Sequence, residues 1–238
     1  TPDTAFRLPN LYIRAGNPQA ALQICRVMIA QRPNDLAMRT EIARLMAESG
    51  VTESAMKEIT GLVTLRPTDI KLLMAAGDIY FQDKPGEAAN YYRKVLEIET
   101  ANNRARVQLG ASLVRSTQYE AALPVLADAL TREGDNHIAH ANLATAYFKL
   151  QRYAEAAGQF LWLIRSKPET AASYFFLAIS LDHLGECQQS LRAYQEFVRR
   201  ADPVASKNEI EDANIKISLQ QRLAKEGKCK TIIKEKGK

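Results

Sequence analysis

Residues 142–157 read NLATAYFKLQRYAEAA. Small residues and tyrosines alternate in this stretch at uneven spacings, and a glutamate precedes a pair of alanines. Alanines let two helices approach closely, and aromatic rings fill the space beside them. The stretch could line an active site, or it could be a packing pattern. If it recurs along the chain, it is a packing pattern, and no chemistry is required of its residues.

The pattern recurs with a period of about 34 residues. Prolines at 33, 67, 168 and 203 stand in similar contexts, and the segments ETANN and EGDNH occupy the two points between Pro67 and Pro168 where the period lacks a proline. Each unit splits into two stretches with an apolar spacing near 3.6, which predicts two helices joined by a turn. The third unit is one residue short at its turn, QDKPGEA. Six units result, covering about 2–33, 36–67, 70–100, 103–134, 137–168 and 171–202.

These units resemble the tetratricopeptide repeat family, whose signature is W-x2-L-G-x2-Y, then A-x3-F, then P. The fifth unit carries Leu143-Ala144, Tyr147, Ala156, Phe160 and Pro168 at these places. Tryptophan is absent from the fourth position of every unit, where His140 and Tyr174 stand in the fifth and sixth. The resemblance implies an all-α, right-handed superhelical solenoid of helix-turn-helix repeats, in which each pair buries its apolar face against its neighbours.

The two ends of the array differ from its middle. Pro9 lies inside the first predicted helix and should kink or shorten it. Ser206-x-x-Glu209 is a capping box, which predicts that a solvating cap helix begins there and runs to about Ala224. We therefore expect one elongated domain over residues 1–224, followed by a flexible basic tail over residues 225–238.

Composition and charge exclude several classes of protein. The net charge is +5, but the tail alone contributes +4, so the body is nearly neutral and does not favour nucleic-acid binding. No apolar run approaches the roughly 18–20 residues that a membrane span needs. No signal peptide is visible, and the chain lacks an initiator methionine, so removal of a targeting segment stays open. A soluble protein is expected, with the cytoplasm favoured and an exported location as the alternative.

The cysteines and histidines form no recognisable chemical site. Three cysteines at 25, 187 and 229 make neither a disulfide framework nor a metal knuckle; the first two should be buried and the third exposed. His137-x-x-His140 places two imidazoles on one helix face, but a zinc site needs further ligands, and His140 occupies a packing position. His183 precedes Cys187 by four residues, with a glycine between them and no third group. We expect His183 to end a helix, and we expect no enzyme activity, no cofactor, no metal and no small-molecule substrate.

The resemblance also implies where a partner would bind. In the tetratricopeptide repeat family the first helix of each unit lines a concave groove, with positions 2, 5, 6, 9, 12 and 13 facing it. Carried onto this sequence, the groove holds a protein or peptide partner through Arg104, Gln108, Arg115, Asn142, Thr145, Phe148, Lys149, Phe175, Phe176 and Ile179. The clamp by which some relatives hold acidic chaperone tails is not matched, because Val107 and Ala111 stand where lysine and asparagine are needed. A cap helix or tail lying over these aromatics is the competing interpretation.

Three other roles remain open at this point. The run Phe160–Ile164 is wholly apolar, so Leu161 or Trp162 should project outward or toward the next unit. That projection, or an open N-terminal unit, would allow the chain to associate with itself. The array could also be the accessory part of a larger protein or enzyme. The basic tail could touch a membrane or nucleic acid through charge alone.

Overall fold

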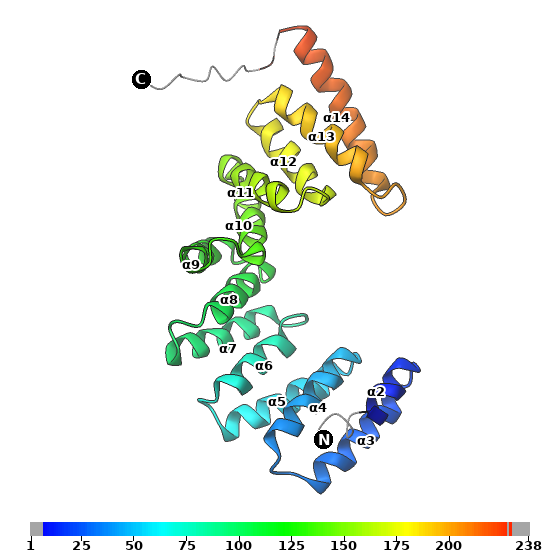
Figure 1. Ribbon diagram of the computed structural model, residues 1–238, viewed down its shortest axis with the longest axis vertical. Helices are drawn as coiled ribbons and strands as arrows, with labels where there is room; N and C mark the ends of the chain where they lie inside the picture. The colour runs from blue at the N-terminus through cyan, green and yellow to red at the C-terminus, as the bar shows by residue number, and fades with distance from the viewer. Residues whose placement is uncertain (1–6, 228, 230–238) are drawn as a thin grey trace. The chain divides into compact units, whose positions relative to one another are not determined.

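The chain folds into helices alone over the part that the computed structural model describes, residues 7–227 and Cys229 (Figure 1). The first helices of the pairs are α2 (Arg7–Arg14), α4 (Leu36–Glu48), α6 (Ile70–Tyr80), α8 (Asn103–Arg115), α10 (His137–Lys149) and α12 (Ala171–His183). The second helices are α3 (Pro18–Gln31), α5 (Thr52–Leu65), α7 (Pro85–Ile98), α9 (Tyr119–Arg132), α11 (Tyr153–Ser166) and α13 (Cys187–Arg200), and α14 (Lys207–Lys225) follows. The predicted all-α fold of paired helices is confirmed.

Side-chain caps fix where four of the first helices begin. Asp35, Asp69, Asn102 and Asn136 each precede a first helix, and each side-chain oxygen accepts a hydrogen bond from a backbone N–H in the first turn. These caps satisfy donors that the helix itself leaves unpaired. The segments ETANN and EGDNH, which lack the proline, therefore still end one helix and begin the next.

The turns inside the pairs share one backbone feature. One residue in each of five turns has a positive φ: Gly16, Gly50, Thr117, Gln151 and Gly185. Glycine adopts this conformation without steric cost, whereas threonine and glutamine do not. The turn between α6 and α7, which is the short one predicted from QDKPGEA, instead runs through Lys84 into Pro85 at the first helical position.

The helices group into two compact units, residues 1–116 and 117–238. In the first unit, successive helices from α2 to α8 pack on one another, with Ile42, Ile59, Leu73 and Tyr92 fully buried. In the second, successive helices from α9 to α14 pack likewise, around a core that includes Phe160, Leu177, Tyr194 and Phe197. No helix among the described residues combines the length and the apolar character needed to cross a membrane.

Gly77 shows why small residues occupy the crossing positions. A Cβ atom added there would lie 2.5 Å from Cε1 and Cζ of Tyr92, which is closer than real carbon contacts allow. Tyr92 is fully buried, and its hydroxyl donates to Asp78 Oδ1 at 2.7 Å. The close approach inferred from the alanine and glycine pattern is present at this helix pair.

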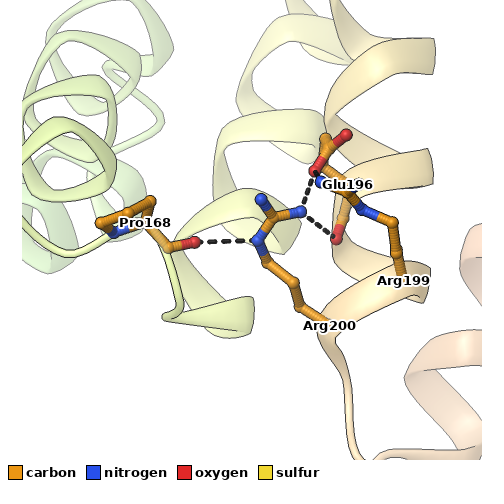
Figure 2. A network of polar contacts seen from close by, with 4 residues as sticks. All are labelled: Pro168, Glu196, Arg199 and Arg200. Atoms are coloured by element: carbon orange, nitrogen blue, oxygen red, sulfur yellow. Dashed lines mark hydrogen bonds and ion pairs between the residues drawn. The ribbon is translucent and has the colours of Figure 1, made fainter.

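Figure 2 shows how α13 is anchored to the link that precedes α12, the first helix of its own pair. Arg200 on α13 donates from Nε to the carbonyl oxygen of Pro168 at 2.8 Å, and its Nη1 contacts the carboxylate of Glu196. The guanidinium also lies 4.5 Å from the ring centre of Tyr174. Arg199 pairs with the same carboxylate at 2.7 Å, but its side chain is 67% exposed against 22% for Arg200.

Three expectations concern the ends of the chain. The described part of α2 runs from Arg7 to Arg14 and contains Pro9, which is buried; the prediction that Pro9 shortens or kinks this helix also involves residues before Arg7, which lie outside the described ones. Ser206 precedes α14 as predicted but makes no side-chain cap, so the capping box is wrong. Asp202 orders that turn instead by accepting from the N–H groups of Val204 and Ala205, which lowers the pKa of its carboxyl. Apart from Lys225–Gly227 and Cys229, the tail lies outside the described residues.

The helix α14 continues the register of the repeats. Lys216 contacts Asp182 at 2.7 Å, and Asp182 precedes it by one period of 34 residues. Figure 1 shows α12, α13 and α14 side by side, and α14 packs on α13. Asn208, Glu211 and Asp212 stand one period after Tyr174, Leu177 and Ala178, and all three are exposed. The cap helix is thus a further first helix whose outer face is mostly polar, with Ile215 exposed beside these three residues.

Candidate partner-binding face

The ten residues predicted to face a partner fall into both compact units. Arg104, Gln108 and Arg115 lie on α8 in the first unit, and the other seven lie on α10 and α12 in the second. Each group is therefore described by itself.

In the first unit Arg104 ties α8 to α6, and Arg115 ties α8 to the turn that follows α6. Arg104 pairs with Asp78 at 3.2 Å, on the carboxylate that also accepts from the Tyr92 hydroxyl. Arg115 donates to the carbonyl oxygen of Gln82 at 3.1 Å from Nη2, and its guanidinium lies 5.5 Å from the ring centre of Phe81. Both arginines are exposed. They hold neighbouring repeats together on this face and still present charge to solvent.

In the second unit, aromatic rings join α10 to α12. The ring centres of Phe148 and Phe176 are 5.2 Å apart. Phe176 also stacks on Phe160 of α11, with 5.7 Å between the ring centres. Phe176 is 37% exposed, whereas Phe148 is half-buried. Ile138, one helix turn before Asn142 on α10, is 54% exposed. These apolar residues and the polar residues between them on α10 form the α10–α12 face, which we define as Ile138, Asn142, Thr145, Phe148 and Phe176.

The polar residues of the α10–α12 face are held by their own helix. Asn142 donates from Nδ2 to the carbonyl oxygen of Ile138 at 2.8 Å, which leaves its Oδ1 as an acceptor on an accessible side chain. Thr145 donates to the carbonyl oxygen of Ala141 at 2.9 Å. These bonds fix the orientation of both side chains, so a ligand would meet Asn142 as a preset acceptor.

The remaining predicted residues contribute less to an open face. Phe175 is half-buried, with its ring 4.7 Å from Phe197, so it belongs mainly to the packing of α12 on α13. Ile179 is half-buried against the same core, and Lys149 is exposed. The sequence pattern could not separate Phe175 from Phe176, because both positions face the groove in the family and only the contacts decide between them.

The cap helix α14 covers the last turn of α12, but it leaves Phe176 exposed. Asp182 accepts from Lys216 and from the Nε2 of Gln220, so α14 lies along the last turn of α12. His183 ends α12 as predicted, and its ring stacks on Tyr153 at 4.1 Å. The Asp182–Lys216 pair was not predicted from the sequence, although the two residues are separated by one period of the repeat.

Trp162 packs on His137 and His140 within one repeat. His140 stacks on Trp162, with 3.6 Å between the ring centres. The Nδ1 of His140 lies 2.7 Å from Oε1 of Gln159, and its Nε2 lies 3.0 Å from the carbonyl oxygen of Gly134. Trp162 therefore packs back on α10 of its own pair, and the outward projection predicted for this run falls to Leu161, which is 39% exposed. Among the residues that the structure describes, no three potential metal ligands gather.

The cysteines are placed nearly as predicted. Cys25 and Cys187 are buried. Cys229 was expected to be exposed but is half-buried. A hydrogen bond with Cys187 raises the pKa of the Cys229 thiol to about 11.

Comparison with known proteins points to one family. A family model described as tetratricopeptide repeat matches residues 107–161 and 142–206. BBSome complex member BBS4 of Bos taurus is 23% identical over 214 residues, which is 86% of this chain and 40% of that protein. Tetratricopeptide repeat protein 8 of Caenorhabditis elegans is 22% identical over 81% of this chain and 38% of that protein. The chain spans less than half of these relatives.

Solved structures share the fold at low identity. A tetratricopeptide repeat protein from Parabacteroides merdae superposes with a TM-score of 0.67 at 15% identity, over 93% of this chain and 92% of that chain. YrrB, described as a TPR protein with an unusual peptide-binding site, gives a TM-score of 0.60 at 18% identity, over 84% and 97% of the two chains. MamA gives 0.64 at 16%, over 72% and 94%.

Proposed function

Because this chain is a tetratricopeptide repeat protein, whose fold serves as a scaffold for protein–protein interaction, we propose that the α10–α12 face binds a peptide or helical segment of a partner protein without catalysing a reaction. The observation that carries the proposal is the exposed ring of Phe176, which Phe148 contacts edge-on, together with the exposed Ile138 nearer the start of α10. Exposed apolar residues grouped on one face mark binding surfaces, and an aromatic anchor carries much of the energy in such contacts.

The chemistry of the face indicates the kind of ligand. Phe176 and Ile138 would receive apolar side chains, and Asn142 Oδ1 would accept a backbone or side-chain N–H from the ligand. Lys149 is exposed at the end of α10. We propose a partner segment with apolar anchors and an acidic residue that reaches Lys149. The bovine relative is a member of a protein complex and YrrB is a peptide-binding protein, which supports a role in assembling other proteins.

The test compares two faces of one repeat region. A photo-crosslinking residue at Thr145 should capture a partner segment from a lysate of the source organism, and mass spectrometry would identify it. Phe176→Ala should reduce capture of that partner by about tenfold or more, since truncating a central anchor costs about 2 kcal/mol. Leu161→Ala, which removes a similarly exposed side chain from α11, is the matched control and should leave capture unchanged.

Two results would refute the proposal. Equal capture by wild type and Phe176→Ala would remove the anchor role, and loss of capture in Leu161→Ala alone would move the site to the other side of the repeat. Phe176 suits this test better than Phe175, because Phe176 is exposed, whereas Phe175 is half-buried against Phe197 and its loss would mainly affect stability. Self-association through Leu161 is the rival role, and concentration-dependent light scattering of the Leu161→Ala variant addresses it in the same preparations.

A further inference from the structure

Two of the three cysteines, which lie far apart in the sequence, meet in the fold. Cys187 is the first residue of α13, is buried, and donates from its Sγ to the carbonyl oxygen of Gly185 at 3.8 Å. Its thiol also shares a hydrogen bond with the thiol of Cys229, which is half-buried. Cys25 is buried on α3 in the first compact unit. The contact therefore joins one particular pair of thiols within the second unit.

The packing of α13 and α14 explains why these two thiols meet. The two helices are joined by the short segment 201–206 and pack side by side (Figure 1), so they run antiparallel and the end of α14 lies near the start of α13. A separate contact agrees with this arrangement. Gln220, near the end of α14, donates to Asp182, which lies in the last turn of α12 shortly before Cys187.

The chain reverses its direction directly after α14. Gly227 has a φ of +65°, and its N–H donates to the carbonyl oxygen of Ala224 at 3.3 Å, as in the left-handed caps that end many helices. Lys225, Glu226 and Gly227 are exposed, whereas Cys229 is half-buried. Burial therefore resumes at the cysteine, which the reversed chain brings back onto the second unit.

We propose that Cys187 and Cys229 form a reversible disulfide that fastens the end of α14 to the start of α13. A disulfide requires two sulfurs whose Cβ atoms lie close together, and the antiparallel helices and the turn at Gly227 supply this proximity. The oxidant is a low-molecular-weight disulfide such as oxidised glutathione. The proposal concerns the end of the second unit and is independent of the α10–α12 face.

The reaction consists of two successive thiol–disulfide exchanges. The thiol of Cys229, the more accessible of the two, loses its proton and attacks one sulfur of oxidised glutathione, which releases one glutathione thiolate and leaves a mixed disulfide. The thiol of Cys187 then loses its proton, attacks the Cys229 sulfur and displaces the second glutathione. The two cysteines are thereby oxidised by two electrons, and one glutathione disulfide is reduced to two glutathione molecules.

The state of the Cys229 thiol sets the conditions of a test. Its hydrogen bond with Cys187 raises its pKa to about 11, so little of the attacking thiolate is present at neutral pH. The exchange should therefore be slow near pH 7, and the equilibration is better carried out at about pH 8.5, where the thiolate is more abundant.

The test compares the folded chain with the unfolded one. The unmodified protein is equilibrated with reduced and oxidised glutathione at a series of ratios, in buffer and in urea, and is then acidified, alkylated and digested. In the folded chain, a peptide that links Cys187 to Cys229 should form at a ratio of oxidant to reductant about tenfold or more lower than in urea, because the fold holds the two thiols together. The matched control Cys25→Ser should leave this link unchanged.

The disulfide should also protect the cap helix. Hydrogen exchange of peptides covering the end of α14 should slow by about fivefold or more when the wild type is oxidised, because the link opposes local opening of this helix from α13. Cys187→Ser and Cys229→Ser should each abolish the slowing, and Cys25→Ser should retain it.

Four results would overturn the proposal. Separate glutathione adducts on Cys187 and Cys229, with no linked peptide, would show that the two thiols do not reach each other. An equal requirement for oxidant in buffer and in urea would show that the fold does not hold the pair together. A link between the Cys229 residues of two molecules, seen as a dimer without reductant, would make the contact intermolecular. A linked chain whose α14 exchanges as fast as in the reduced protein would show that the bond does not fasten the helix.

Discussion

At Gly77 the space for a side chain is already occupied by the ring of Tyr92. Gly77→Ala should lower the free energy of unfolding by about 2–3 kcal/mol, because the buried ring must shift against its packing and its bond to Asp78. Denaturant unfolding followed by circular dichroism measures this. The control is Gly61→Ala in α5, where a Cβ meets nothing within 4 Å; it should raise stability by about 0.5–1 kcal/mol through helix propensity. Equal effects of the two substitutions would contradict the close approach.

Gln151 is a second residue whose backbone conformation should measurably lower the stability of the protein. Its φ of +58° lies in the left-handed region, where Gly185 stands in the following repeat with a φ of +77°. Gln151→Gly should relieve backbone strain of about 1–2 kcal/mol. Part of this gain is offset because glycine loses more backbone entropy on folding, so we expect a net stabilisation of about 0.5–1 kcal/mol and a higher thermal midpoint. The reciprocal change Gly185→Gln should lower the midpoint. A loss of stability in Gln151→Gly would show that the glutamine side chain contributes more than the strain costs.

At the scale of elements, Arg200 and Arg199 form a matched pair on α13. Arg200→Ala removes the bond to Pro168, the contact with Glu196 and the stack on Tyr174, so we expect a loss of about 1–2 kcal/mol. Arg199→Ala removes only an exposed ion pair and should cost about 0.5 kcal/mol or less. Thermal unfolding of both variants is the measurement. If the two variants lose equal stability, the contacts of Arg200 with Pro168 and Tyr174 do not contribute the stabilisation expected of them.

The helices themselves were predictable, because each pair repeats the same apolar spacing between capping residues such as Asp35 and Asn136. Details that depend on one contact were not. Ser206 has the sequence of a capping box, but Asp202 orders the turn before it. Phe175 and Phe176 are identical in sequence terms, yet only Phe176 is exposed, because the ring of Phe175 meets Phe197. Local pattern predicts elements, whereas the surroundings of a side chain decide which residues a ligand could reach.

At the scale of the whole molecule, each compact unit contains a tyrosine whose pKa is raised by burial. Tyr92 lies in the first unit, where the hydrogen bond to Asp78 adds to the effect, and Tyr194 lies in the second. The raised values mean that the native protein keeps these protons after unfolded tyrosine, with a pKa of about 10, has released them. Stability is therefore complete below about pH 10 and declines above it, by about 1.4 kcal/mol per pH unit for each such group.

The test is the slope of stability against pH. Denaturant unfolding between about pH 9 and 11 should show a shallower decline in Tyr92→Phe with Tyr194→Phe than in wild type. The variant will be less stable at neutral pH, because the bond to Asp78 is lost, so only the slope is diagnostic. An unchanged slope would mean that other groups govern alkaline unfolding.

The stack of Trp162 on His140 has a consequence for spectroscopy. The chain contains a single tryptophan, and its indole lies against the imidazole ring of the facing helix at 3.6 Å. Its emission should therefore change in wavelength and intensity when α10 and α11 separate, with no added label. Because α10 also carries Asn142 and Phe148, the intrinsic fluorescence of the unmodified protein should report the binding of a segment that shifts α10 against α11.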